Sequence, residues 1–124
     1  MTLRLNAMID GIGKIGDDLE KYLNLLSVRQ KLTASNIANA DTPGYKTRDI
    51  DFQAEFAAAM QGESSPRVYE IAGLPVKNDG NNVSMDREAR MLAENALRFN
   101  LGVQLLRGEL EDVRKAIRSG GESG

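Results

Sequence analysis

Apolar residues recur along the first part of the chain with the three-and-four spacing of a coiled-coil helix. This seam is formed by Leu5, Met8, Ile12, Ile15, Leu19, Tyr22 and Leu26. After its last member the same line becomes polar, and a second apolar line with Leu25, Val28 and Leu32 replaces it on a neighbouring face. The pattern predicts a long N-terminal helical arm over residues 5–40.

A similar and longer seam runs along the last third of the chain. Its members are Ala89, Leu92, Ala96, Phe99, Val103, Leu106, Leu110, Val113 and Ile117. Ser84 is placed to cap the helix, acidic residues follow in the first turn and basic residues occupy the last turn, which suits the helix dipole. The pair Gly120–Gly121 is a helix stop signal. We therefore expect a C-terminal helical arm over residues 84–118.

The connector at residues 41–83 begins with a helix stop. Pro43 disfavours helical geometry at Thr42, so the first arm should end at or before that residue. The four residues from Thr42 to Tyr45 are typical of a type II turn, because Pro43 fixes φ at the second position and Gly44 supplies a positive φ at the third. Tyr45 then leaves the turn as a large side chain with a polar tip.

The rest of the connector carries weaker signals. Phe52, Phe56 and Met60 predict a short amphipathic helix over about residues 52–61. Residues 68–71 are expected to form either a strand that pairs with residues 76–77 in a short β-hairpin or part of an extended excursion. The polar run after this hairpin reads as a turn.

These elements predict a mainly α protein with a single domain over residues 1–124. Two long terminal helices form a coiled-coil core and are joined by an irregular connector with a short β-hairpin. The glycines at positions 11, 13 and 16 weaken the first helix by about 1 kcal/mol each, so residues 1–16 are expected to order on assembly. The apolar surface exceeds what one partner arm covers, which implies neighbouring subunits. A monomeric helical hairpin is the alternative that the pattern leaves open.

Composition narrows the function classes. The chain contains no Cys and no His, so thiol chemistry and the commonest general base are unavailable, and we expect no enzyme, cofactor or metal site. A net charge of −2 argues against a nucleic-acid partner. No stretch approaches the length of a membrane span, and no secretory signal peptide is expected at the N-terminus.

Some patterns are given ordinary structural interpretations. The run Gly11–Gly16 matches the glycine spacing of a dinucleotide-binding loop, but only ten residues precede it and the heptad seam continues through it. Asp49 and Asp51 are expected in a solvated turn or in a salt bridge to Arg48, not in acid–base catalysis. The arginines of the C-terminal arm, Arg87 among them, are expected on its solvated face, and ion pairs of these arginines with another subunit are the alternative.

One string is more specific than its turn chemistry. The run from Ser35 to Lys46, SNIANADTPGYK, resembles the signature of the bacterial flagellar axial proteins, which is roughly Asn-Asn-Leu-Ala-Asn-x-x-Thr-Pro-Gly-Tyr. Ser35 replaces the first Asn and Ile37 replaces the Leu. The continuation to Phe52 and the short chain are similar to the proximal rod type of this family.

The resemblance implies a structural subunit of the flagellar basal-body rod in the periplasmic space, assembled helically through its terminal helices to transmit torque. The implied partners are copies of itself, other rod proteins and the adaptor to the membrane ring and export gate. It also implies type III export without a cleaved signal. The implied assembly motif is Asn36, Asn39, Thr42, Pro43, Gly44 and Tyr45. The expected helix-seam interface is Leu19, Tyr22, Leu26, Leu92, Phe99, Val103, Leu106, Leu110, Val113 and Ile117. The alternatives are a coiled-coil adaptor, a secretion chaperone and a neighbouring proximal rod subunit.

Overall fold

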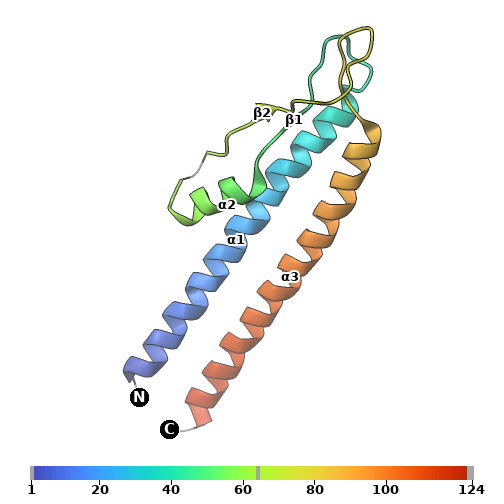
Figure 1. The fold of residues 1–124 in the computed structure, drawn as a ribbon. Coiled ribbons are helices and arrows are strands. Elements are labelled where there is room, and N and C mark those ends of the chain that lie inside the picture. The colour runs from blue at the N-terminus through green and yellow to red at the C-terminus, as the bar shows by residue number, and fades with distance from the viewer. Residues whose placement is uncertain (1, 64, 123–124) are drawn as a thin grey trace.

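The computed structural model describes residues 2–63 and 65–122 and is built on two long antiparallel helices (Figure 1). In chain order the elements are α1 (Thr2–Ala38), β1 (Arg48–Asp49), α2 (Phe52–Met60), β2 (Tyr69–Glu70) and α3 (Met85–Glu122). α1 and α3 lie side by side, with both chain termini at one end and the connector at the other. We call these the open end and the closed end. The expected fold class, two long terminal helices with a small two-stranded sheet in the connector, is confirmed.

The apolar core lies between the middle of the helix pair and the closed end. It consists of Leu25, Leu26, Ile50 and Phe52, and five half-buried residues pack against it: Tyr22, Leu23, Val28, Leu32 and Phe56. The ring of Tyr22 meets the ring of Phe52 edge-on at 5.4 Å. The Arg98 guanidinium of α3 lies 5.2 Å from the centre of the Phe52 ring, a cation–π distance. The short helix α2 therefore attaches to both long helices through its aromatic side chains.

α3 approaches α1 most closely at Gly102. A Cβ atom built on Gly102 would lie 2.8 Å from Cδ2 of Leu23 and 3.4 Å from Cδ1 of Tyr22. Three fully buried residues, Glu88, Asn95 and Gly102, lie seven residues apart along α3. The line of α3 that faces α1 therefore passes through small and polar residues. The apolar seam expected from the sequence is rotated away from it by one position.

The connector differs from the expectation in its strand pairing. β2 pairs with β1 in antiparallel register, with Arg48 opposite Glu70 and Asp49 opposite Tyr69. The predicted hairpin between residues 68–71 and 76–77 is wrong, because β1 supplies the ladder partner and the Ile71 backbone N–H donates to the Thr47 carbonyl at 2.9 Å. A pairing between segments 20 residues apart leaves no local sequence signal.

Two local predictions in the connector are confirmed, the short helix over about residues 52–61 and the type II turn. α2 occupies Phe52–Met60, and the Asp51 carboxylate caps it by accepting from the Ala54 backbone N–H at 3.2 Å. The turn after α1 has the type II features, with Gly44 at φ 76° and the Tyr45 N–H donating to the Thr42 carbonyl at 3.2 Å.

The C-terminal boundary of α3 differs as well. Ser84 caps α3 as expected, since its Oγ accepts from the Arg87 N–H at 3.2 Å. The predicted stop at Gly120 is wrong, because α3 continues to Glu122. Gly120 keeps a negative φ, and a glycine ends a helix only where it adopts the left-handed conformation.

Candidate assembly site

The expected assembly motif lies at the closed end, where α1 passes into the connector. Asn36 is 1% exposed and all four hydrogen-bonding positions of its amide are occupied. Its Nδ2 donates to the Arg48 carbonyl at 2.9 Å and to Glu88 Oε2 at 3.2 Å. Its Oδ1 accepts from the Tyr45 hydroxyl at 2.9 Å and from the Arg48 N–H at 3.1 Å. One side chain thereby joins α1, the connector and α3.

The second asparagine of the motif holds the turn. Asn39 Nδ2 donates to the Ser35 carbonyl at 2.8 Å, and its Oδ1 accepts from the Thr42 hydroxyl at 3.0 Å. The carbonyls of Asn39 and Thr42 both accept from Nδ2 of the buried Asn81, each at 2.8 Å. These carbonyls also accept from the backbone N–H groups of Thr42 and Tyr45, so the Asn81 amide adds a second hydrogen bond to each of them.

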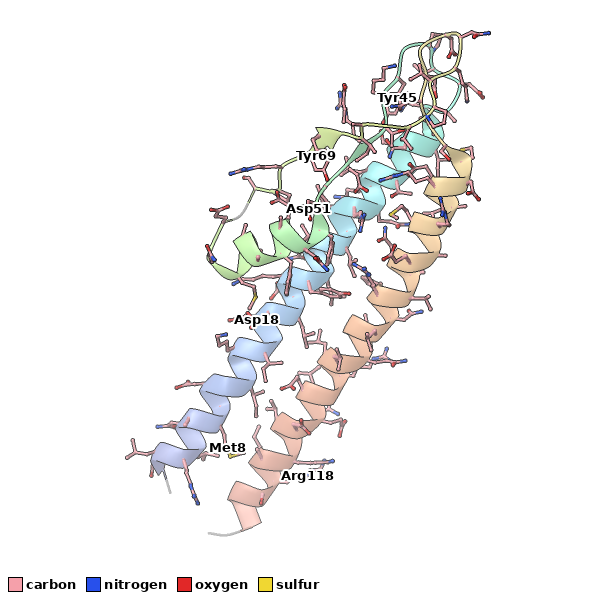
Figure 2. All side chains as sticks on the ribbon, in the orientation of Figure 1. Met8, Asp18, Tyr45, Asp51, Tyr69 and Arg118 are labelled. Carbon is pink, nitrogen blue, oxygen red and sulfur yellow. The ribbon has the colours of Figure 1, made fainter. Side chains whose placement is uncertain are left out.

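The exposed part of the motif is the turn itself. Thr42, Pro43 and Gly44 are exposed, whereas Tyr45 is half-buried and lies where the connector meets α1 (Figure 2). The Gly44 N–H donates to the Asp79 carbonyl at 2.9 Å, and a Cβ on Gly80 would lie 3.3 Å from the Gly44 Cα. The two connector loops therefore touch backbone to backbone at this point.

Four charged side chains are buried beside the motif. The Asp49 carboxylate accepts from Nε and Nη2 of Arg29, each at 3.1 Å, and from Nη2 of Arg87 at 2.6 Å. Arg87 Nη1 also donates to Oε1 of Glu88 at 2.8 Å. Two arginines and two carboxylates balance in charge, so each buried ion has a partner. We call these four residues, together with Asn36, Asn39, Tyr45 and Asn81, the closed-end network.

Burial and charge act in opposite directions on the Arg87 guanidinium. Desolvation lowers its pKa, but the hydrogen bonds and negative charges of Asp49 and Glu88 outweigh this effect and raise the pKa above the ordinary value of arginine. A raised folded-state pKa contributes stability that is fully present below the ordinary pKa of arginine, and this contribution is lost only as the pH rises through the raised folded-state pKa. Arg87 is therefore a permanent cation in the network.

The network corrects two expectations from the sequence. The partners of Asp49 are Arg29 and Arg87, not Arg48, and Arg87 is not on a solvated face. Sequence analysis missed Arg29, Glu88 and Asn81, which are distant along the chain. The available signal was Arg29 on the line where the N-terminal seam turns polar. A charged residue on a buried helix line implies a buried partner.

The structure places the expected seam residues in three environments. Leu26 is buried in the core, and Leu19, Tyr22, Leu92, Val103, Leu106 and Val113 are half-buried between the helices. Within this chain, Phe99, Leu110 and Ile117 remain 47%, 55% and 68% exposed. An intramolecular pair of helices covers only one line of α3, which leaves the flank with these three residues open.

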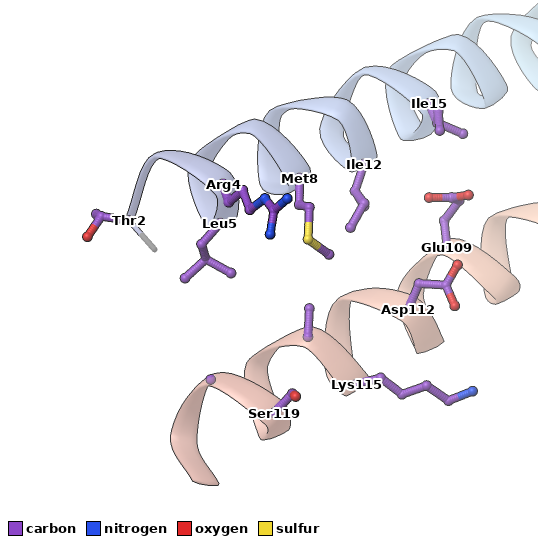
Figure 3. Close-up of a pocket in the computed structure, with 12 residues that line it drawn as sticks. Thr2, Arg4, Leu5, Met8, Ile12, Ile15, Glu109, Asp112, Lys115 and Ser119 are labelled. Atoms are coloured by element: carbon purple, nitrogen blue, oxygen red, sulfur yellow. The ribbon is translucent and has the colours of Figure 1, made fainter. Parts of the chain in front are cut away.

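The open end is apolar and incompletely filled. A groove of about 860 Å³ lies between the helix ends on one side of the pair, with Leu5, Met8 and Ile12 facing Asp112 and Lys115 across it (Figure 3). A second groove of about 470 Å³ on the other side is lined by Ile9, Ile117 and other apolar residues. At the open end, the apolar side chains of α1 and α3 are therefore only partly covered by the partner helix.

Within residues 2–63 and 65–122, no group of carboxylates is arranged to hold a metal ion. No helix in the described part of the chain is long and apolar enough to cross a membrane. What the closed end presents is a balanced set of internal bonds, and what the open end presents is apolar helix surface.

The comparisons with known proteins agree with this arrangement. Residues 23–46, which contain the motif, match the model of the family described as "Flagella basal body rod protein". The chain is 36% identical to the flagellar basal body rod protein FlgB of Salmonella typhimurium, covering 82% of this chain and 91% of that one. It is 35% identical to FlgB of Escherichia coli with the same coverage, and 29% identical to FlgB of Borrelia hermsii, of which 94% is covered.

Proposed function

Because the chain belongs to the FlgB family of flagellar basal body rod proteins and is a structural subunit of the rod, we propose that it builds the proximal rod by packing its terminal helices against those of neighbouring copies. The observation that carries this proposal is the exposed apolar surface of α1 and α3. Leu5, Met8 and Ile9 on α1 and Leu110 and Ile117 on α3 are all at least 40% exposed. Packing against further helices would remove this surface from water.

The proposed assembly is helical. A contact between two different surfaces of the same subunit is heterologous, and repeated heterologous contacts that do not close produce a helical filament. α1 and α3 present different residues to solvent, which favours such a contact. A rod built in this way would transmit torque through many helix contacts that share the load.

The closed-end network has a positioning role in this proposal. It fixes the connector and the first turns of α3 relative to the last turns of α1 through bonds from Asn36, Asp49 and Glu88. The helix-seam residues would then emerge in the same geometry in every copy. We propose that the motif Asn36, Asn39, Thr42, Pro43, Gly44 and Tyr45 serves assembly by determining subunit shape.

The partners follow from this position. Other basal-body rod components adjoin the subunit, and we propose that an adaptor links it to the membrane ring and export gate. The chain would act in the periplasmic space after type III export without cleavage of a signal peptide. It would act without catalysis, as a single domain whose arms are the two long helices. A coiled-coil adaptor or a secretion chaperone is not favoured, because the relatives are rod proteins.

The proposal is tested in the native bacterium with its own gene deleted. The parent chain, carrying a short internal tag in the exposed loop after α2, should restore motility and appear in a density map of purified basal bodies at the base of the rod. The matched control is Leu106→Asp, which places a charge on the seam of α3. This variant should leave the cytoplasm yet form no rod. Retention of the parent chain in the cytoplasm of motile cells would contradict the proposal.

A further inference from the structure

α3 carries a stripe of alternating apolar and basic residues on the flank beside its line of contact with α1, exposed at every member except the half-buried Val103. With spacings of four and three residues, the stripe consists of Val103, Arg107, Leu110, Arg114 and Ile117. Leu110 and Ile117 are more than half exposed, and Arg107 has no ion pair within the described residues. Arg114 pairs only with the neighbouring Glu111, at 3.2 Å on the surface, and such exposed pairs contribute little stability.

α1 carries an exposed stripe of the same spacing and the opposite charge. Its members are Asn6, Asp10, Gly13, Asp17 and Glu20. All five residues are exposed. Among the residues that the structure describes, the only ion pair in this half of α1 joins Lys14 to Asp18, and neither of these belongs to the stripe. Nothing lies within 4 Å of a Cβ built on Gly13, so another helix has room to approach there.

Resting on the proposed function, we propose that the acidic stripe of α1 in one copy docks antiparallel on the basic stripe of α3 in the next copy. Charge complementarity identifies the occupant as a second copy, since this chain supplies both halves of the contact. In this register Arg107 faces Asp17, Arg114 faces Asp10, and Leu110 fills the space beside Gly13. The paired charges flank one apolar contact, which is the arrangement of a coiled-coil seam with charged edges.

The antiparallel direction follows from the subunit itself. α1 and α3 run in opposite directions within the chain (Figure 1). Copies that share the polarity of a rod therefore bring α1 of one copy antiparallel to α3 of its neighbour. The same geometry places Ile117 beside Asn6 and Val103 beside Glu20. The contact is heterologous and leaves a free stripe at each end of the array, so it propagates.

A charge exchange tests the contact in cells that lack their own copy of the gene. Arg107→Glu with Arg114→Glu should reduce the number of rods in basal-body preparations at least tenfold, and so should Asp10→Lys with Asp17→Lys. The four substitutions together should restore rods to within about threefold of the parent, because the pairs are re-formed with reversed sign. The matched control is Lys31→Glu with Arg90→Glu, two exposed residues outside both stripes and outside the open-end grooves, which should leave rod number unchanged.

The results separate this contact from the rod function. If the parent chain forms rods but each charge-reversed pair does so too, or the fourfold variant is no better than the worse pair, the stripe contact is overturned and the rod function stands. Failure of the parent chain itself overturns both. Circular dichroism of each purified variant should match the parent, which excludes loss of the helices as the cause.

Orientation is tested by disulfide formation, since the chain has no cysteine of its own. Two differently tagged copies are co-expressed, one with Ile117→Cys and the other with Asn6→Cys, so that only an intermolecular bond joins the two tags. Oxidised basal bodies should contain the mixed dimer. When Glu20→Cys replaces Asn6→Cys, the mixed dimer should fall at least fivefold. The reverse result would overturn the antiparallel register.

Discussion

The closed end and the open end of the helix pair are stabilised in opposite ways. At the closed end, Asn36, Asp49 and Glu88 are at most 3% exposed, and their hydrogen bonds and ion pairs are satisfied within the chain. At the open end, the side chains of Met8 and Ile117 are 54% and 68% exposed, so the rest of the chain covers less than half of each. The difference teaches that one end is complete in the single subunit, whereas the other end requires neighbours.

The polar character of the closed end has a physical consequence. Buried ion pairs contribute modest net stability, but removal of one partner is costly because the remaining charge stays buried. Such a network therefore tolerates few alternative arrangements. The open end presents mainly apolar helix surface, so its geometry depends strongly on what packs on that surface.

The largest expected effect is the loss of Asp49. Asp49→Leu leaves Arg29 and Arg87 partly buried without their shared carboxylate and should lower the free energy of unfolding by about 3–5 kcal/mol. Urea denaturation followed by circular dichroism measures the change. The control is Asp86→Leu, which removes only an exposed pair with Arg90 at 3.6 Å and should cost less than about 0.5 kcal/mol. Equal effects of the two variants would show that the network does not stabilise the closed end.

The next largest effect compares two leucines of the expected seam. Leu26 is 2% exposed, so Leu26→Ala should destabilise the free subunit by about 2–5 kcal/mol. Leu110 is 55% exposed, so Leu110→Ala should change the free subunit by less than about 0.5 kcal/mol while reducing rod formation. Denaturation of the purified chains and counts of basal bodies give the two readouts. A free subunit that is strongly destabilised by Leu110→Ala would contradict the division between the two ends.

A smaller effect is expected at the exposed turn. Gly44 has φ 76°, so Gly44→Val should strain the turn by about 1 kcal/mol or more although no atom lies near the new Cβ. Because the change in subunit shape recurs in every copy, rod formation should suffer more than the stability of the free chain. Pro43→Ala serves as the milder control. Normal rods from Gly44→Val would mean that the turn only ends the helix.

The smallest effect separates two glycines of α3. Gly108 has open space around a built Cβ, so Gly108→Ala should raise the free energy of unfolding by about 1 kcal/mol through helix propensity. At Gly102 the new methyl group would meet Leu23 at 2.8 Å, and the gain should be reduced or cancelled as that side chain shifts. Thermal unfolding of both variants measures the difference. Equal gains at the two positions would show that the helices are not in close contact at Gly102.

Two features of α3 were beyond sequence analysis. The heptad spacing indicated a long helix with one apolar line that includes Leu92 and Ile117. It did not indicate that α1 covers only part of this line, so that Leu92 is half-buried while Ile117 is exposed. Asn95 lies on the buried line, yet its Oδ1 has no hydrogen-bond partner in the described residues. The spacing of apolar residues identifies the apolar surface of a helix. Which side of α3 faces α1 depends on where the two helices come close together, and they do so at Gly102.

The sequence by itself determined the two long helices, the turn at Pro43–Gly44 and the short helix α2, because each depends on residues within about one helical turn of one another. It also contained the family motif. Only the tertiary structure decided that Asp49 binds Arg29 and Arg87, that Asn36 binds Glu88, and that β1 pairs with β2. These contacts join residues 20 to 52 positions apart, and their partners are selected by the way the connector folds back along α1, which local spacing does not encode.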